Sequence, residues 1–148
     1  MARARGFTLI EVMVVFAIMA LVMAVVPIAY DKMHSAAQYR DVVRGMVANL
    51  RAARQRAELS GRDVLFSVDL RQRLYGLEGA PEQSIPEAVS VRATVASTEV
   101  RDDRFTIRFL PSGGASGGSL DVARSSGDGV RLRVDWFSGR IEQEPLKP

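Results

Sequence analysis

An uncharged apolar run near the start of the chain constrains the fold more than any other feature. Its nineteen consecutive residues, Val12–Tyr30, are mostly Val, Met, Ala and Ile. A helix over residues 7–30 would be about 36 Å long, enough to cross the hydrocarbon core of a bilayer. One carboxylate, Glu11, lies in the first turns of this helix, and Arg3 and Arg5 stand just ahead of it. We therefore predict a transmembrane helix that carries an acid near its start.

The N-terminus differs from a cleaved secretory signal. Such signals have an apolar region of about 7–15 residues and a small-x-small cleavage site, whereas this run is longer and no such site follows it. A plain signal anchor is the simplest alternative, with Arg3 and Arg5 in the cytoplasm and everything after Tyr30 across the membrane. Glu11 would then reach for the headgroups, at less than the roughly 2.5–3.5 kcal/mol that an acid costs at the bilayer centre. This alternative tolerates the acid without explaining it.

Composition limits the possible functions of the rest of the chain. Of its 148 residues, 118 follow the first thirty, which is enough for one domain with its own core. The absence of cysteine excludes disulfides, thiolate metal sites and cysteine nucleophiles. Without Arg3 and Arg5, 18 basic residues stand against 17 acids, a formal charge of +1. The single histidine, His34, has only Asp31 near it at helical spacing, so we predict no catalytic residue, no metal and no cofactor.

The residues around the acid carry a family resemblance. Arg-Gly-Phe-Thr-Leu-Ile-Glu (5–11), followed by the apolar run, resembles the N-terminus of type IV prepilins and type II secretion pseudopilins. In that family a prepilin peptidase cuts after the glycine and methylates the new amino terminus. The resemblance implies a leader peptide over residues 1–6, cleavage between Gly6 and Phe7, and N-methylation of Phe7.

This processing offers Glu11 a partner. Cleavage leaves a cationic amine at Phe7, and in a helical filament Glu11 of one subunit can pair with the amine of a neighbour. A buried acid without a partner is strongly penalised, whereas a paired one tolerates burial. The pair favours one register between subunits, as a single buried polar group does in coiled coils. We therefore predict a role in filament assembly for Glu11.

Beyond the apolar run the chain is predicted to stay helical to about Leu59. Pro27 lacks an amide hydrogen and crowds the carbonyl of Met23, which predicts a kink there. Residues 31–60 form an amphipathic continuation, because apolar residues recur at steps of three and four before Gly61 stops the helix. The apolar stripe is either a coiled-coil seam or a surface that packs on a sheet. We favour the sheet, because the stripe is rich in alanine and strands follow it.

After residue 61 the apolar period changes from 3.6 to 2, which predicts strands. The predicted strands lie at 64–68, 74–77, 89–95, 105–109, 120–122, 130–136 and 140–142, with a loop at 79–86. They are close enough in sequence to pair as antiparallel neighbours. Residues 61–148 are therefore predicted to form a β-rich globular domain. The fold class is α+β, a long N-terminal helix packed on an antiparallel β-domain of two sheets.

A glycine-rich segment, Pro111–Gly118, precedes a strand and lacks the Lys-Ser/Thr ending of a phosphate loop, so we expect a flexible inter-strand loop. Two stretches, Phe109–Gly118 and Val134–Ile141, extend the resemblance. Both resemble the H-type minor pseudopilin and its relative, the T-type minor type IV pilin. That group has a helix followed by a two-sheet β-domain, which agrees with the strand pattern.

The resemblance implies a structural protein and not an enzyme. It implies a minor pseudopilin of a type II secretion system, at or near the tip of the periplasmic pseudopilus that helps push exoproteins through the outer membrane. The expected location is the bacterial inner membrane, single-pass, with a cytoplasmic N-terminus and a periplasmic C-terminal domain. Expected partners are the other minor pseudopilins, the major pseudopilin, the prepilin peptidase and the secretin or exoprotein substrates.

The alternative function is a DNA-binding T-type minor pilin, acting in pilus biogenesis or DNA uptake. Its support is two groups of arginines: Arg101, Arg104 and Arg108, and Arg131, Arg133 and Arg140. Acids lie among these arginines, the processed chain has a formal charge near +1, and the tail after Arg140 contains two acids. These features indicate solvated strand faces, and we predict that nucleic acid is not a partner.

Overall fold

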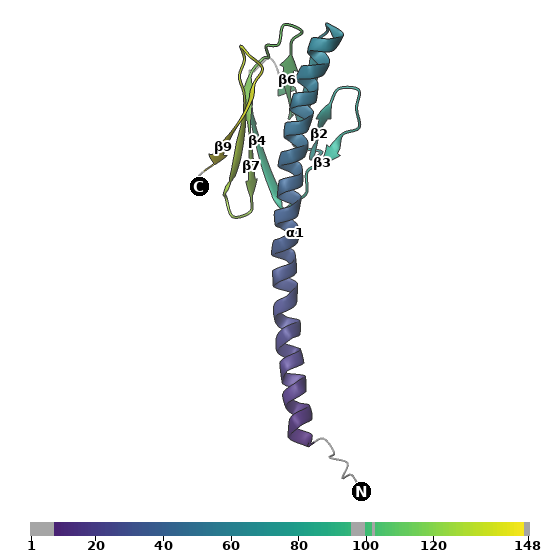
Figure 1. Cartoon of the computed structure of the whole chain (residues 1–148), viewed down its shortest axis with the longest axis vertical. Coiled ribbons are helices and arrows are strands. Elements are labelled where there is room, and N and C mark those ends of the chain that lie inside the picture. Colours follow the sequence, from purple (N-terminus) through teal and green to yellow (C-terminus); the bar gives the residue numbers. More distant parts are fainter. Residues whose placement is uncertain (1–7, 96–99, 102, 147–148) are drawn as a thin grey trace. The chain divides into compact units, whose positions relative to one another are not determined.

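The computed structural model describes residues 8–95, 100–101 and 103–146, with residues 24–33 and 100–101 described by their backbone alone. In this part of the chain one helix, α1 (Leu9–Ser60), precedes the strands. The chain divides into two compact units, Met1–His34 and Ser35–Pro148. The first unit contains the N-terminal part of α1, and the second contains the rest of the helix and every described strand (Figure 1).

Helix α1 has nearly the predicted bounds. It ends at Ser60, followed by Gly61 at a φ of 64°, whose amide donates to the carbonyl of Ala57 at 3.1 Å. Glycine suits this left-handed position because it has no Cβ. The kink predicted at Pro27 falls where the backbone is described only as helical, and it stays a prediction.

The strands form two antiparallel sheets, as predicted. The first has five strands in the order β3-β2-β1-β6-β5. These are β1 (Val64–Asp69), β2 (Leu74–Leu77), β3 (Gln83–Ser84), β5 (Val100–Arg101) and β6 (Arg104–Phe109). The second has four in the order β4-β7-β8-β9. These are β4 (Val89–Thr94), β7 (Gly118–Arg124), β8 (Gly129–Val134) and β9 (Ile141–Leu146).

One hydrophobic core joins the second half of α1 to both sheets. The helix contributes Met46, Leu50, Ala53 and Ala57, each 0% exposed. Each sheet adds its inward-pointing side chains, including Phe66 and Phe109 from the first and Leu120, Val122 and Leu132 from the second. The small alanines let the helix approach the strands closely. Packing on a sheet, rather than a coiled-coil seam, therefore explains the predicted apolar stripe.

Three strand predictions differ from the structure. The described chain has nine strands rather than the seven predicted, because β3 lies inside the predicted loop at 79–86 and β5 was not predicted. Strand β9 continues to Leu146 although its sequence does not alternate, because it pairs with β8 along its length. Strand β8 stops at Val134, so Trp136 lies beyond it and is 68% exposed instead of facing the core.

Arg73 holds the segment where the chain passes from the first sheet to the second. Its guanidinium donates to the carbonyls of Ile85 at 3.0 Å, Pro86 at 2.6 Å and Val89 at 2.8 Å. In return, the amide of Ile85 donates to the carbonyl of Arg73 at 2.7 Å. The turn at residues 70–73, between β1 and β2, therefore also positions the start of β4.

Candidate functional site

Glu11 closes a capping box at the start of α1. The Thr8 amide donates to Glu11 Oε2 at 3.4 Å, and the Glu11 amide donates to Thr8 Oγ1 at 3.4 Å. This reciprocal pair satisfies two amides that a helix start leaves without partners. It also places a negative charge at the positive end of the helix dipole. Gly6 and Phe7 lie outside the described residues, so their cleavage and methylation stay predictions.

The residues that follow Glu11 form an apolar surface. Every residue from Leu9 to Met23 is exposed in the single chain, with Leu9 at 82% and Phe16 at 68%. An apolar patch of this extent is typical of a surface that lipid or another protein covers. Within the described residues, no helical stretch has both the length and the apolarity needed to cross a membrane. The span predicted over residues 7–30 extends beyond those residues.

The two stretches that extend the family resemblance meet in space, at one end of the β-domain. The Ala115 amide donates to the carbonyl of Trp136 at 2.9 Å, and the Ser116 amide donates to the carbonyl of Arg108 at 2.8 Å. Gly139, at a φ of 60°, packs so closely on the Gly113 carbonyl that a side chain would overlap it. The glycine-rich segment connects two strands, as predicted. It is held by backbone hydrogen bonds to Arg108 and to Trp136, which differs from the expected flexible loop.

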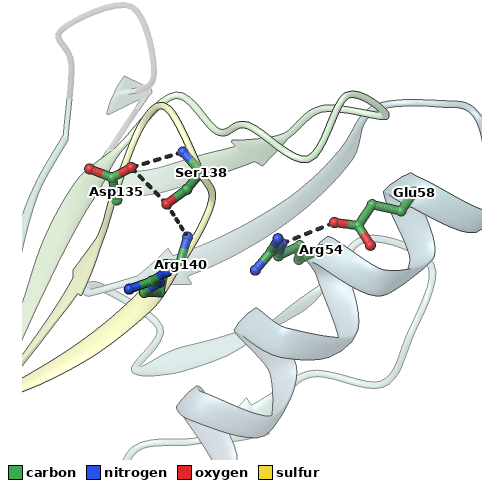
Figure 2. Close-up of polar contacts among 5 residues, drawn as sticks. All are labelled: Arg54, Glu58, Asp135, Ser138 and Arg140. Carbon is green, nitrogen blue, oxygen red and sulfur yellow. Dashed lines mark hydrogen bonds and ion pairs between the residues drawn. The ribbon is translucent and has the colours of Figure 1, made fainter.

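A turn between β8 and β9 completes this junction. Asp135 Oδ1 accepts hydrogen bonds from the Ser138 amide and hydroxyl, both at 2.8 Å, and the Arg140 amide donates to the Ser138 hydroxyl at 3.4 Å (Figure 2). The amide and then the hydroxyl of Ser138 lower the pKa of Asp135 below its ordinary value. Figure 2 shows the turn beside the end of α1, where Arg54 and Glu58 pair at 3.0 Å.

The turn presents two aromatic rings to solvent. Trp136 and Phe137 are 68% and 77% exposed, and their rings meet edge to face with centroids 5.8 Å apart. A hollow of about 540 Å³ lies beside Trp136, lined by the end of β4, the glycine-rich segment and β8. Exposed aromatic residues beside a hollow are typical of protein interfaces. The strand pattern hid this surface, although Ser138-Gly139 already indicated a turn two residues later.

Most of the arginines behind the DNA-binding alternative are in ion pairs. The pairs are Arg104 with Asp69 and Glu82, Arg108 with Asp63, Arg131 with Asp121, and Arg133 with Glu144. Arg131 holds its partner with two short hydrogen bonds, which lower the pKa of the Asp121 carboxyl. The side chain of Arg101 lies outside the described residues. This pairing matches the solvated strand faces expected from the sequence.

No catalytic constellation emerges from the part of the chain that the structure describes. His34 is exposed on α1. Among the described residues, no group of three or more His, Cys, Asp and Glu side chains is placed to hold a metal ion. The candidate sites are therefore surfaces: the helix start with its apolar side chains, and the junction with its exposed aromatic pair.

Comparisons with known proteins agree on one family. Residues 1–27 match the family model of the prokaryotic N-terminal methylation motif, and residues 42–139 match that of type II transport protein GspH. The chain is 30% identical over 146 residues to type II secretion system protein H of Xanthomonas campestris pv. campestris. The alignment covers 97% of this chain and 85% of that protein.

Two solved structures show the same fold. The minor pseudopilin EpsH of the Vibrio cholerae type 2 secretion system aligns with a TM-score of 0.50 and 14% identity, over 77% of this chain and 95% of that one. The type IV minor pilin FimU of Pseudomonas aeruginosa aligns with a TM-score of 0.50 and 16% identity, over 74% of this chain and 92% of that one. At these identities the likeness concerns the fold alone.

Proposed function

Because the chain belongs to the GspH family of type II secretion minor pseudopilins, we propose that it lies at or near the tip of a periplasmic pseudopilus and helps push exoproteins through the outer membrane. The family is structural and not enzymatic. Membership implies assembly with other pseudopilins, and the methylation motif implies processing by a prepilin peptidase and anchoring in the inner membrane. In our proposal residues 7–30 span that membrane and residues 61–148 are periplasmic.

One observation carries the proposal: a carboxylate stands at the start of a helix whose next turns are wholly exposed and apolar. Among the described residues, the hydrogen bonds of Glu11 at the helix start are local, to Thr8. When neighbouring helices cover Leu9–Met23, the carboxylate leaves water and needs a cationic partner. The methylated amine of Phe7 on an adjacent subunit supplies that charge. The helix start then selects the register in which subunits assemble.

The capping box allows this role to be separated from a purely local one. Gln at the position of Glu11 still completes a capping box but carries no charge, so Glu11→Gln tests the ion pair. Thr8→Ala keeps the carboxylate and removes half of the box, which costs about 0.5–2 kcal/mol of helix stability. We expect Glu11→Gln and Glu11→Ala to lose assembly, and Thr8→Ala to keep most of it.

The measurement uses the full-length protein in cells that carry the other pseudopilins of its system. Co-purification with those pseudopilins reports assembly, exoprotein in the medium reports secretion, and the amount of protein in the membrane serves as the control. If Glu11→Gln assembles like the wild type while Thr8→Ala does not, the acid serves the helix start alone and the pairing role is wrong.

The aromatic pair at the junction supports the more specific part of the proposal, contact with the secretin or an exoprotein. Trp136 and Phe137 are exposed beside a hollow, so a partner can bury them without unfolding the domain. We expect Trp136→Ala with Phe137→Ala to reduce secretion while co-purification with other pseudopilins stays intact. Unchanged secretion would remove this surface from the proposal.

The ion-paired strand arginines do not favour the DNA-binding alternative. A phosphate-binding surface needs free cations, and its affinity falls steeply as salt rises. Titration of the purified protein with duplex DNA at two salt concentrations tests this alternative directly. Tight binding with a steep salt dependence would favour it over the secretion role.

A further inference from the structure

The face of α1 that points away from the sheets is strongly basic. Six exposed residues form it, spaced so that they share one side of the helix: Arg40, Arg44, Ala48, Arg51, Gln55 and Leu59. We call this set the basic face, and the exposed Arg56 flanks it. Residues three, four, seven and eleven apart lie along one helical stripe. The stripe is the reverse of the buried side formed by Met46, Leu50 and Ala53.

The charges of the basic face are not neutralised within the described chain. Arg54, at its border, pairs with Glu58 at 3.0 Å, but no ion pair of the described residues includes Arg40, Arg44 or Arg51. Two exposed acids share this side of the helix: Glu58, which pairs with Arg54, and Asp41, three residues before Arg44. Two like charges four residues apart, as in Arg40 and Arg44, destabilise a helix by about 0.2–0.5 kcal/mol. No ion pair within the described chain accounts for this arrangement, which points to a partner outside it.

The length of the basic face selects an elongated partner. Arg40 and Arg51 are eleven residues apart, so their Cα atoms are separated by about 16 Å along the axis, twice the Debye length of about 8 Å at physiological salt. A single small anion therefore cannot serve both. A second helix with acids three, four or seven residues apart can, because its side chains repeat along its axis at the same pitch.

The apolar residues of the basic face favour a protein over a nucleic acid. Leu59 is 80% exposed, and a shallow, open hollow lies beside it on the helix surface, lined by Ala52, Gln55, Arg56 and Ser60. A phosphate backbone offers no apolar group to fill this hollow, whereas an apolar side chain of a protein does. The basic face also lies on the same helix as the exposed Leu9–Met23, which packs against neighbouring subunits in the proposed function.

We propose that the basic face of α1 binds an acidic helix of a neighbouring pseudopilin. The arginines pair with carboxylates repeated along that helix, and Leu59 packs against one of its apolar side chains. This inference rests on the proposed assembly with other pseudopilins and adds the chemistry of the contact. It makes the association dependent on salt, because the pairs form at an exposed interface.

The experiment reverses charge on the basic face and on a matched control. The double variant Arg44→Glu/Arg51→Glu is compared with Arg62→Glu/Arg92→Glu, which changes the charge equally at exposed arginines outside the helix that, like Arg44 and Arg51, have no ion pair among the described residues. Full-length proteins are co-purified with each pseudopilin of the system, and circular dichroism checks the fold. We expect at least a tenfold loss of co-purification for the first variant, none for the second, and recovery when acids on the partner helix become lysine.

Each outcome has a separate meaning. If the wild-type chain associates with no pseudopilin, the proposed function itself fails. If it associates and Arg44→Glu/Arg51→Glu associates equally well, the proposed function stands and this inference is wrong. Duplex DNA and vesicles of anionic phospholipid serve as competing probes. If the basic-face variant loses binding to either probe while keeping its pseudopilin partners, the face binds nucleic acid or lipid and the inference is overturned.

Discussion

The two faces of α1 between Tyr39 and Ser60 differ in the contacts that their side chains make. On one face Met46, Leu50 and Ala53 are fully buried against the sheets. On the other, Arg44 and Arg51 are exposed and have no ion-pair partner among the described residues. The folded chain alone explains the first face, because it fills the core. No ion pair among the described residues accounts for the second, whereas the proposed partner helix does. Changes on the buried face should therefore alter stability, and changes on the exposed face should alter association.

The largest effect should come from Leu50→Ala. Leu50 is 0% exposed, and its truncation leaves a cavity between the helix and the strands, at a cost of about 2–5 kcal/mol. Leu59→Ala is the matched control on the exposed face, with an expected change within about 0.5 kcal/mol. Thermal unfolding of the full chain in detergent measures both. If the two leucine variants lost equal amounts of stability, the two faces would not differ in their contribution to the fold.

A smaller effect is expected where the two faces meet, at Gly45. A side chain there would overlap the Tyr75 hydroxyl, which donates to Gln83 Oε1 at 2.6 Å. Gly45→Ala gains up to about 1 kcal/mol of helix propensity but loses about 1–3 kcal/mol to overpacking. We expect a net destabilisation of about 1 kcal/mol. Because Tyr75→Phe removes the overlapping oxygen, Gly45→Ala should cost less in that background, and an unchanged cost would refute the steric explanation.

Arginines inside and outside ion pairs should also differ in their effect on stability. Arg104 pairs with Asp69, whose side chain is only 10% exposed, and with Glu82. Arg104→Ala leaves that buried acid without its cation, at an expected cost of about 1 kcal/mol. Arg44→Ala should change the unfolding temperature very little. A loss for Arg44→Ala as large as that for Arg104→Ala would mean that the basic face supports the fold.

The smallest effect is a pH dependence at the Asp121–Arg131 pair. Arg131 donates to both carboxylate oxygens, at 2.6 and 2.8 Å, and its hydrogen bond lowers the pKa of folded Asp121. The resulting stability is present above the unfolded pKa, about 3.9, and is lost as the pH falls through the folded value. Asp121→Asn should lower stability by about 0.5 kcal/mol at pH 7. Thermal unfolding at pH 7, 5 and 3 measures the stability difference between the wild type and Asp121→Asn. We expect this difference to shrink only at pH 3.

Several parts of the fold follow from local sequence. The helix is predictable because its apolar period persists to Leu59 and Gly61 then supplies the left-handed stop. Strands β1, β4 and β6 are predictable because one of their faces is apolar. Glu11 is conspicuous because a lone carboxylate precedes an uncharged run. In each case the signal lies within a few residues of the feature that it predicts.

Other parts depend on contacts between distant segments. Strand β9 has little apolar pattern of its own and forms because β8 offers a free edge for pairing. Trp136 alternates with core residues, but the turn begun by Asp135 carries it into solvent. Only the tertiary structure shows that Arg104, Arg108, Arg131 and Arg133 on the strands have acids opposite them, while Arg40, Arg44 and Arg51 on the helix have no ion pair among the described residues. The sequence by itself determined a pilin-like helix and its acid, because both signals are local. Which charges remain free for a partner was decided by the fold, because pairing depends on distance in space.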